Sequence, residues 1–179
     1  IYSSLPSLDA LTDYRPKIPL RVYSNEGLLI GEFGAERRNV VKISEVPTHL
    51  KQAILAAEDD RFYEHGGVDF MGVLRAAYSN FSAGSVRQGA STITMQVARN
   101  FFLTREKTIT RKLSEALLAY KIENNLSKDN ILELYINQIY LGQRSYGFAA
   151  AAQTYFGKSL PEINTAEAAM LAGLPKAPS

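Results

Sequence analysis

From Pro47 onward, apolar residues recur at helical spacing, and this period limits most strongly what the chain can fold into. Leu50, Ile54 and Ala57 share one face of an expected helix that begins near Pro47. With 46% hydrophobic residues among 179, the chain can bury a core. The sequence therefore predicts a mainly helical domain. Further helices are expected at about 70–78, from 91 onward, at 109–120, at 127–142 and at about 165–172.

Three of these helices have clear apolar stripes. The helix capped by Ser91 carries Ile93, Val97 and Phe101 on one side. The helix at 109–120 is expected to face the core with Ile109, Leu113, Ala116, Leu117 and Tyr120. The helix between a cap at Ser127 and an end at Gly142 carries Ile131, Leu132, Tyr135, Ile136 and Ile139.

The first part of the chain has a different composition. Residues 1–19 are rich in Ser, Pro and Asp, which is typical of a linker. Two β-prone runs within 20–33 flank an Asn-Glu-Gly turn and predict a hairpin. We therefore divide the chain into a membrane-proximal linker and hairpin at 1–45 and a helical domain at 46–179. A small, polar stretch at 80–88 is expected to be a loop.

Composition excludes several classes of function. The net charge of +2 gives no sign of nucleic-acid binding, and the absence of cysteine excludes disulfides and thiolate metal sites. No stretch of these residues approaches the ~20 apolar residues of a membrane span, and none shows a signal-peptide pattern. Both ends look abrupt, so we expect a piece of a longer protein and leave a preceding membrane anchor open.

Residues 58–60 are three adjacent acidic residues at the end of an apolar helix. Acidic rows of this kind usually lie on the surface. Glu58, however, is expected at the C-terminal end of its helix, where the negative end of the helix dipole favours a proton-accepting carboxylate. Phe62 and Tyr63 are expected to form an apolar wall beside it. His65 alone is more often a structural histidine than a ligand.

The helix after Ser91 carries a polar face. Thr92, Gln96 and Arg99 lie at i, i+4 and i+7, opposite the apolar side. Because Gly89 precedes this helix, its N-terminus could offer unpaired backbone N–H groups to an anion. Many amphipathic helices have a polar stripe, so a solvated face is the alternative.

A cationic cluster surrounds Glu115. Arg111 and Lys112 lie one turn before it, and two further cations lie within 105–107. The simple interpretation is a helical ion pair of about 0.3 kcal/mol. The functional interpretation is that Glu115 orients cations that, with Arg99, neutralise a pyrophosphate leaving group.

Five segments in a fixed order resemble the motifs of the peptidoglycan glycosyltransferases, glycosyltransferase family 51. They read EDDRFYEHGG at 58–67, GASTITMQ at 89–96, RKLSE at 111–115, KDNILELYIN at 128–137, and RSYG to YFGK at 144–158. The resemblance runs from about residue 20 to the end. The hairpin region and the ending LPKAPS look more like class A penicillin-binding proteins of the 1a type than monofunctional transglycosylases. This implies a transpeptidase domain downstream.

The resemblance implies a lysozyme-like helical fold that polymerises lipid II into glycan strands and releases undecaprenyl pyrophosphate. It implies a place at the extracytoplasmic, periplasmic side of the cell membrane, with an N-terminal transmembrane anchor outside this sequence. Glu58 would be the catalytic base, and Glu115 a second catalytic carboxylate. No tightly bound cofactor is implied, although a divalent cation, Mg²⁺ or Mn²⁺, could assist. Substrate and pyrophosphate binding are implied for Asp59, Phe62, His65, Ser91, Thr92, Gln96, Arg99, Asn100, Arg111 and Lys112.

Two positions depart from the family pattern. Met95 stands where the family usually has Gln, and on a helix it points away from the polar face, so we expect it to affect packing more than catalysis. Arg99 stands where many members have Lys, which keeps the charge but changes its geometry.

Two other functions stay open at this stage. A lysozyme-like hydrolase could use Glu58 as its acid and Glu115 as its second carboxylate, but it would not need the cationic cluster. A non-catalytic glycan-binding module would bind lipid II without releasing undecaprenyl pyrophosphate.

Overall fold

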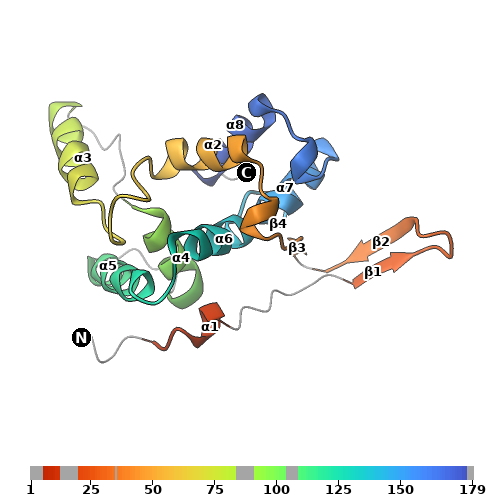
Figure 1. Ribbon diagram of the computed structural model, residues 1–179, viewed down its shortest axis with the longest axis horizontal. Coiled ribbons are helices and arrows are strands. Elements are labelled where there is room, and N and C mark those ends of the chain that lie inside the picture. Colours follow the sequence, from red (N-terminus) through yellow and green to blue (C-terminus); the bar gives the residue numbers. More distant parts are fainter. Residues whose placement is uncertain (1–5, 13–19, 35, 84–90, 104–108, 177–179) are drawn as a thin grey trace. The chain divides into compact units, whose positions relative to one another are not determined.

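A computed structural model describes residues 6–12, 20–34, 36–83, 91–103 and 109–176. The chain divides into two compact units: Ile1–Thr12 with Leu55–Tyr135, and Asp13–Ile54 with Ile136–Ser179. The mainly helical class is confirmed, with a few short strands (Figure 1). None of the described helices is long and apolar enough to cross a membrane. The domain division at residue 45 stays a prediction.

The first unit contains helices from two stretches of the chain, and the helices are labelled in Figure 1. Two long helices, α2 (Thr48–Glu58) and α6 (Lys128–Gln138), have residues in both units. The other helices of the first unit are α1 (Asp9–Thr12), α3 (Phe70–Ala83), α4 (Ile93–Phe102) and α5 (Ile109–Glu123). Helices α4 and α5 pack on each other. The buried apolar side chains of this unit include Phe62, Ile93, Val97, Leu118, Ile122, Ile131, Leu132 and Tyr135.

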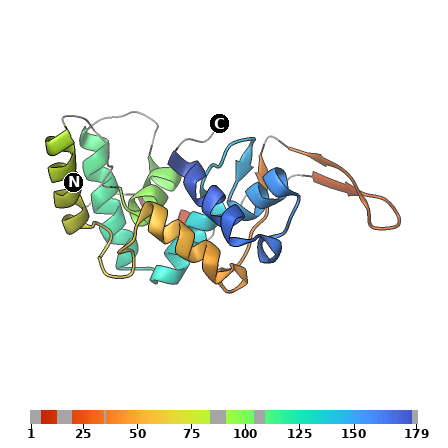
Figure 2. The ribbon, with the colours of Figure 1, turned by 90° about the horizontal axis from the view of Figure 1, so that it is seen from above.

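The second unit begins with the expected hairpin. Strands β1 (Leu20–Tyr23) and β2 (Leu29–Phe33) pair antiparallel, as the two arrows in Figure 2 show. Its turn is closed by the N–H of Ser24, which donates to Leu28 O at 2.7 Å, and Gly27 adopts a φ of +81° there. A polar, glycine-containing turn between β-prone runs was a sufficient signal for the hairpin.

In the rest of the second unit, segments that are far apart in the sequence pair with each other. Strand β3 (Arg37–Arg38) pairs parallel with β4 (Ser145–Tyr146), which the sequence did not predict because two-residue strands carry no periodic signal. Helices α7 (Phe148–Phe156) and α8 (Thr165–Gly173) follow. Short 3₁₀ turns lie at Ile43–Glu45, Leu160–Glu162 and Leu174–Lys176. The buried side chains of this unit include Leu50, Ile54, Ile136, Leu141, Phe148 and Leu171.

Several helix boundaries differ from the prediction. Helix α6 ends at Gln138 rather than Gly142, because the chain turns there to bring Tyr140 into a bridge with Tyr146. Helix α3 continues to Ala83, so the first part of the predicted loop is helical, and residues 84–88 lie outside the described residues. The cap of α4 is Thr92 rather than its neighbour Ser91.

The expected core stripe of α5 is wrong. Leu113 is 53% exposed and Tyr120 is 56% exposed, while Leu118 and Ile122 are fully buried. The stripe with Leu113 and Tyr120 and the stripe with Leu118 and Ile122 both carry apolar residues. Periodicity alone therefore could not show which of the two is buried. The packing of α5 against α4 selects the stripe that also contains Glu115, which is fully buried.

Gly147 caps the start of α7 at a position that strongly favours glycine. Its φ is +87° with ψ 156°, and a Cβ there would lie 2.8 Å from Asn137 O and 3.0 Å from Ile136 O. Gly157, at the other end of α7, also has a positive φ of +65°, but no described atom would lie within 4 Å of an added Cβ.

These two glycines form a matched pair for a stability measurement. We expect Gly147→Ala to lower the free energy of unfolding by about 2–3 kcal/mol, because strain and a backbone clash add. Gly157→Ala should cost about 1 kcal/mol, the penalty for the left-handed region alone. Urea denaturation followed by circular dichroism measures both; equal costs would contradict the role of the clash.

Candidate active site

Glu58 is the last residue of α2, as the sequence predicts. The side-chain amide of Gln96, on α4, donates to Glu58 Oε2 at 2.9 Å. Glu58 Oε1 is buried, and no described residue donates a hydrogen bond to it. One oxygen of the Glu58 carboxylate therefore accepts the hydrogen bond from Gln96, and the other oxygen can accept a proton.

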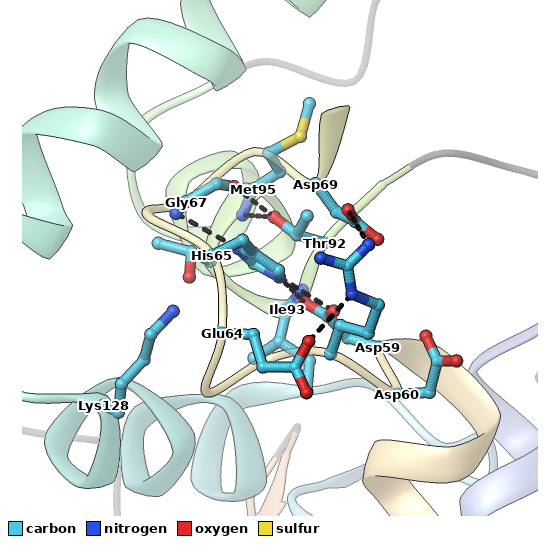
Figure 3. Close-up of polar contacts among 12 residues, drawn as sticks. Asp59, Asp60, Glu64, His65, Gly67, Asp69, Thr92, Ile93, Met95 and Lys128 are labelled. Carbon is cyan, nitrogen blue, oxygen red and sulfur yellow. Dashed lines mark hydrogen bonds and ion pairs between the residues drawn. The ribbon is translucent and has the colours of Figure 1, made fainter. Parts of the chain in front are cut away.

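Asp59 anchors the turn after Glu58 to the start of α4 (Figure 3). His65 Nε2 lies 2.9 Å from Asp59 Oδ1, and the backbone N–H of Ile93 donates to Asp59 Oδ2 at 3.0 Å. The N–H of Gly67 donates to His65 Nδ1 at 3.2 Å. Because Nδ1 is an acceptor, the neutral imidazole carries its proton on Nε2 and donates it to Asp59. His65 thus orients Asp59 in this arrangement, and its predicted role in substrate binding stays a prediction.

The expectation of a free anion site at the start of α4 is wrong. Asp59 accepts from the N–H of Ile93, and Thr92 Oγ1 accepts from the N–H of Met95 at 3.1 Å. Thr92 Oγ1 also donates to Gly67 O at 2.6 Å. A carboxylate of the protein itself interacts with the positive end of the helix dipole. The negative charge that this dipole favours is therefore supplied by the carboxylate of Asp59, a side chain of the protein itself.

The polar face of α4 is buried rather than solvated. Thr92 is 3% exposed and Gln96 is 6% exposed, so the solvated alternative is wrong for both. Arg99 is half-buried and Asn100 is exposed, and their roles in binding stay predictions. Met95 is buried, which agrees with the expected role in packing.

Glu115 is a buried carboxylate at the centre of a charge cluster. Its Oε1 lies 3.1 Å from Arg111 Nε, its Oε2 lies 3.3 Å from Lys112 Nζ, and its side chain is fully buried. Lys112 Nζ also donates to Ser91 Oγ at 2.5 Å. A solvent-exposed helical ion pair would not need such burial, so the simple interpretation is wrong. Glu115 orients both cations; the cations within 105–107 lie outside the described residues.

Tyr135, predicted only as part of an apolar stripe, belongs to the electrostatic surroundings of Glu58. Its side chain is fully buried, and this burial raises the pKa of its hydroxyl well above the usual value. The charge of Glu58 raises that pKa further, whereas the charge of Arg99 acts in the opposite direction. The carboxylate of Glu58 and the guanidinium of Arg99 therefore both lie within electrostatic range of the Tyr135 hydroxyl.

The two aromatic residues of the first motif have different surroundings. Phe62 is 1% exposed, which fits the expected apolar wall. Tyr63 is 53% exposed and donates to Asp129 Oδ1 at 2.9 Å, so it is not part of a buried wall. Partial burial of its hydroxyl and this hydrogen bond raise the pKa of Tyr63 to about 12. Its role is to attach the turn to the start of α6.

Comparison with known proteins identifies the family of this chain. The family model for Transglycosylase matches residues 26–179. Penicillin-binding protein 1A of Neisseria flavescens is 63% identical over 178 residues, which are 99% of this chain and 22% of that protein. Penicillin-binding protein 1A of Pseudomonas aeruginosa is 53% identical, over 98% of this chain and 21% of that protein.

A crystal structure of penicillin-binding protein 1A from Haemophilus influenzae also aligns, with 33% identity and a TM-score of 0.44, over 92% of this chain and 15% of that one. The chain belongs to the transglycosylase family, over a segment that contains all five motifs. The resemblance inferred from those motifs, and the enzyme class that it implied, are thus confirmed. The chain spans about a fifth of the length of these curated relatives.

Proposed function

We propose that this chain is a peptidoglycan glycosyltransferase that polymerises lipid II into glycan strands in bacterial cell wall synthesis. The observation that carries the proposal is the position of Glu58: its carboxylate is oriented by Gln96, and its buried Oε1 is available as a proton acceptor. A carboxylate in such a position suits a general base. The substrate follows from the motifs that this family shares.

In the proposed reaction, Glu58 removes the proton from the 4-hydroxyl of the acceptor GlcNAc. The oxygen then attacks the anomeric carbon of the donor MurNAc and inverts it from α to β. The bond from that carbon to undecaprenyl pyrophosphate breaks, and the pyrophosphate leaves with the electron pair. Arg99, Arg111 and Lys112 would stabilise its negative charge, because guanidinium groups and ammonium groups bind phosphate oxygens well. Glu115 would hold the last two in place.

A divalent cation, Mg²⁺ or Mn²⁺, was the cofactor expected to assist. The described residues do not fit a resident metal: no group of three or more His, Asp or Glu side chains lies together as a ligand set. Both oxygens of Glu115 also face cations. We therefore assign no step to a metal, and its requirement is to be tested by adding a chelator to the assay.

The proposed place of action is the extracytoplasmic, periplasmic side of the cell membrane, where lipid II is anchored by its undecaprenyl chain. An N-terminal transmembrane helix and a downstream transpeptidase domain would belong to the complete protein. The greater length of the relatives supports further segments in the complete protein, and their kind is part of the proposal. Lipid II, the growing glycan strand and the membrane surface are the proposed partners, and nucleic acid is not among them.

The test is to incubate the chain in detergent separately with lipid II and with polymeric peptidoglycan. We expect lipid II to be lengthened and undecaprenyl pyrophosphate to be released. Shortening of peptidoglycan would support the hydrolase alternative, and binding without release would support a glycan-binding module. The pairing of Glu115 with two cations disfavours the hydrolase, which would need Glu115 as a free second carboxylate.

A further inference from the structure

Lys128, the first residue of α6, contacts two groups from other parts of the chain. Its ammonium lies 2.8 Å from Glu123 Oε1 and 4.3 Å from the centroid of the Phe62 ring. The side chain is only 20% exposed, and that of Glu123 is 9% exposed. Both contacts are of kinds that strengthen when water is excluded.

Phe62 and Glu123 each interact with a different part of the candidate active site. Phe62 belongs to the turn that follows Glu58, and its N–H donates to Asp59 O at 3.1 Å. Glu123 Oε1 also accepts a hydrogen bond, at 2.6 Å, from the hydroxyl of Thr94 on α4. One ammonium group therefore connects the turn after the proposed base with the helix that carries Gln96.

The same turn is attached to α4 at a second place. The Ile93–Asp59 bond and the bond from Thr92 Oγ1 to Gly67 O join the two segments directly. Gly67 in turn lies against α5, since a Cβ there would be 3.0 Å from Ala119 O. Lys128, on α6, contacts the same turn through the ring of Phe62. Figure 3 shows its side chain near the turn.

We propose that Lys128 is a positioning residue: it fixes the turn at 59–67 against α4 and thereby holds Glu58 in register with Gln96. It acts through Phe62 and Glu123, and it takes no part in proton transfer. This inference rests on the proposed function and adds to it a residue whose role is geometric. An apolar side chain could also pack on Phe62, but it would leave the buried Glu123 carboxylate without its cation.

The experiment compares Lys128→Met, which keeps the stem and removes the charge, with Lys128→Arg, which keeps both contacts possible. Lys121→Met is the matched control, because that ammonium bonds Pro6 O and none of the residues of the turn. Lipid II polymerisation gives kcat and KM. Amide hydrogen exchange is measured at Gly67 and Ile93, and at Ala168 on α8 as a reference.

For Lys128→Met we expect kcat to fall about tenfold with KM within about twofold, and exchange at Gly67 and Ile93 to rise about tenfold. Exchange at Ala168 should not change. Lys128→Arg should recover kcat to within about threefold of the wild type, because a guanidinium also binds carboxylates and aromatic faces. Lys121→Met should behave as the wild type in every measurement.

The inference is overturned if Lys128→Met keeps its kcat and its exchange rates, or if exchange rises equally at Ala168, which would indicate general destabilisation. It is also overturned if Lys128→Arg is as impaired as Lys128→Met. If the wild-type chain does not polymerise lipid II, the proposed function fails, and local exchange in the Lys128 variants still decides whether the ammonium fixes the turn.

Discussion

Replacing Glu58 with glutamine is expected to lower the rate of lipid II polymerisation by about 10²–10⁴-fold, which is the usual contribution of a general base. Glutamine has the same shape and can still accept the hydrogen bond that Gln96 donates to Glu58 Oε2. Its amide cannot take the proton of the acceptor hydroxyl. KM should therefore change little, and the loss should appear in kcat.

The control for this variant is Asp60→Asn. Asp60 lies in the same acidic row, but its side chain is 57% exposed and pairs only loosely with Arg75, at 3.4 Å. We expect this variant to polymerise lipid II at a rate close to that of the wild type. Near-normal polymerisation by Glu58→Gln would remove Glu58 from the role of base, whatever Asp60→Asn does.

Replacing Glu115 with glutamine should have the largest effect on stability. We expect a loss of about 3 kcal/mol in the free energy of unfolding, because the cations that the buried carboxylate neutralises are left uncompensated. Lys112 is 47% exposed and can be solvated, which limits the loss. Urea denaturation gives the stability. Polymerisation should also fall sharply, since Arg111 and Lys112 lose the group that orients them.

The control for Glu115 is an exposed ion pair of similar length. Glu64 lies 3.0 Å from Arg61 and is 67% exposed, so Glu64→Gln should change the free energy of unfolding by less than about 0.5 kcal/mol. If Glu115→Gln were as mild, the cluster around Glu115 would be an ordinary helical ion pair after all.

Much of the fold was predictable because its signals are local. The hairpin between β1 and β2 follows from β-prone runs around a glycine turn, and α8 follows from its apolar residues and the cap at Asn164. The wrong stripe of α5 shows the limit of such signals. Leu113 and Leu118 are equally apolar, and only contact with α4 decides which of them is buried.

For the site, the sequence placed Glu58 at a helix end and Glu115 beside its cations. It gave Tyr135 and Lys128 no separate role, because the motif-like segment at 128–137 does not show which groups elsewhere in the chain its side chains approach. Each interacts with a group that is far away in the chain: Tyr135 with the charge of Glu58, and Lys128 with the ring of Phe62.

The sequence by itself determined the helical class and the order of the motifs, and it predicted the groups that would do the chemistry. Only the tertiary structure decided that Asp59 interacts with the start of α4, that Glu115 is fully buried and that Gln96 donates a hydrogen bond to Glu58. The physical reason is that hydrophobic period and caps restrict backbone angles within one element. Contacts between side chains of different elements depend on how those elements pack.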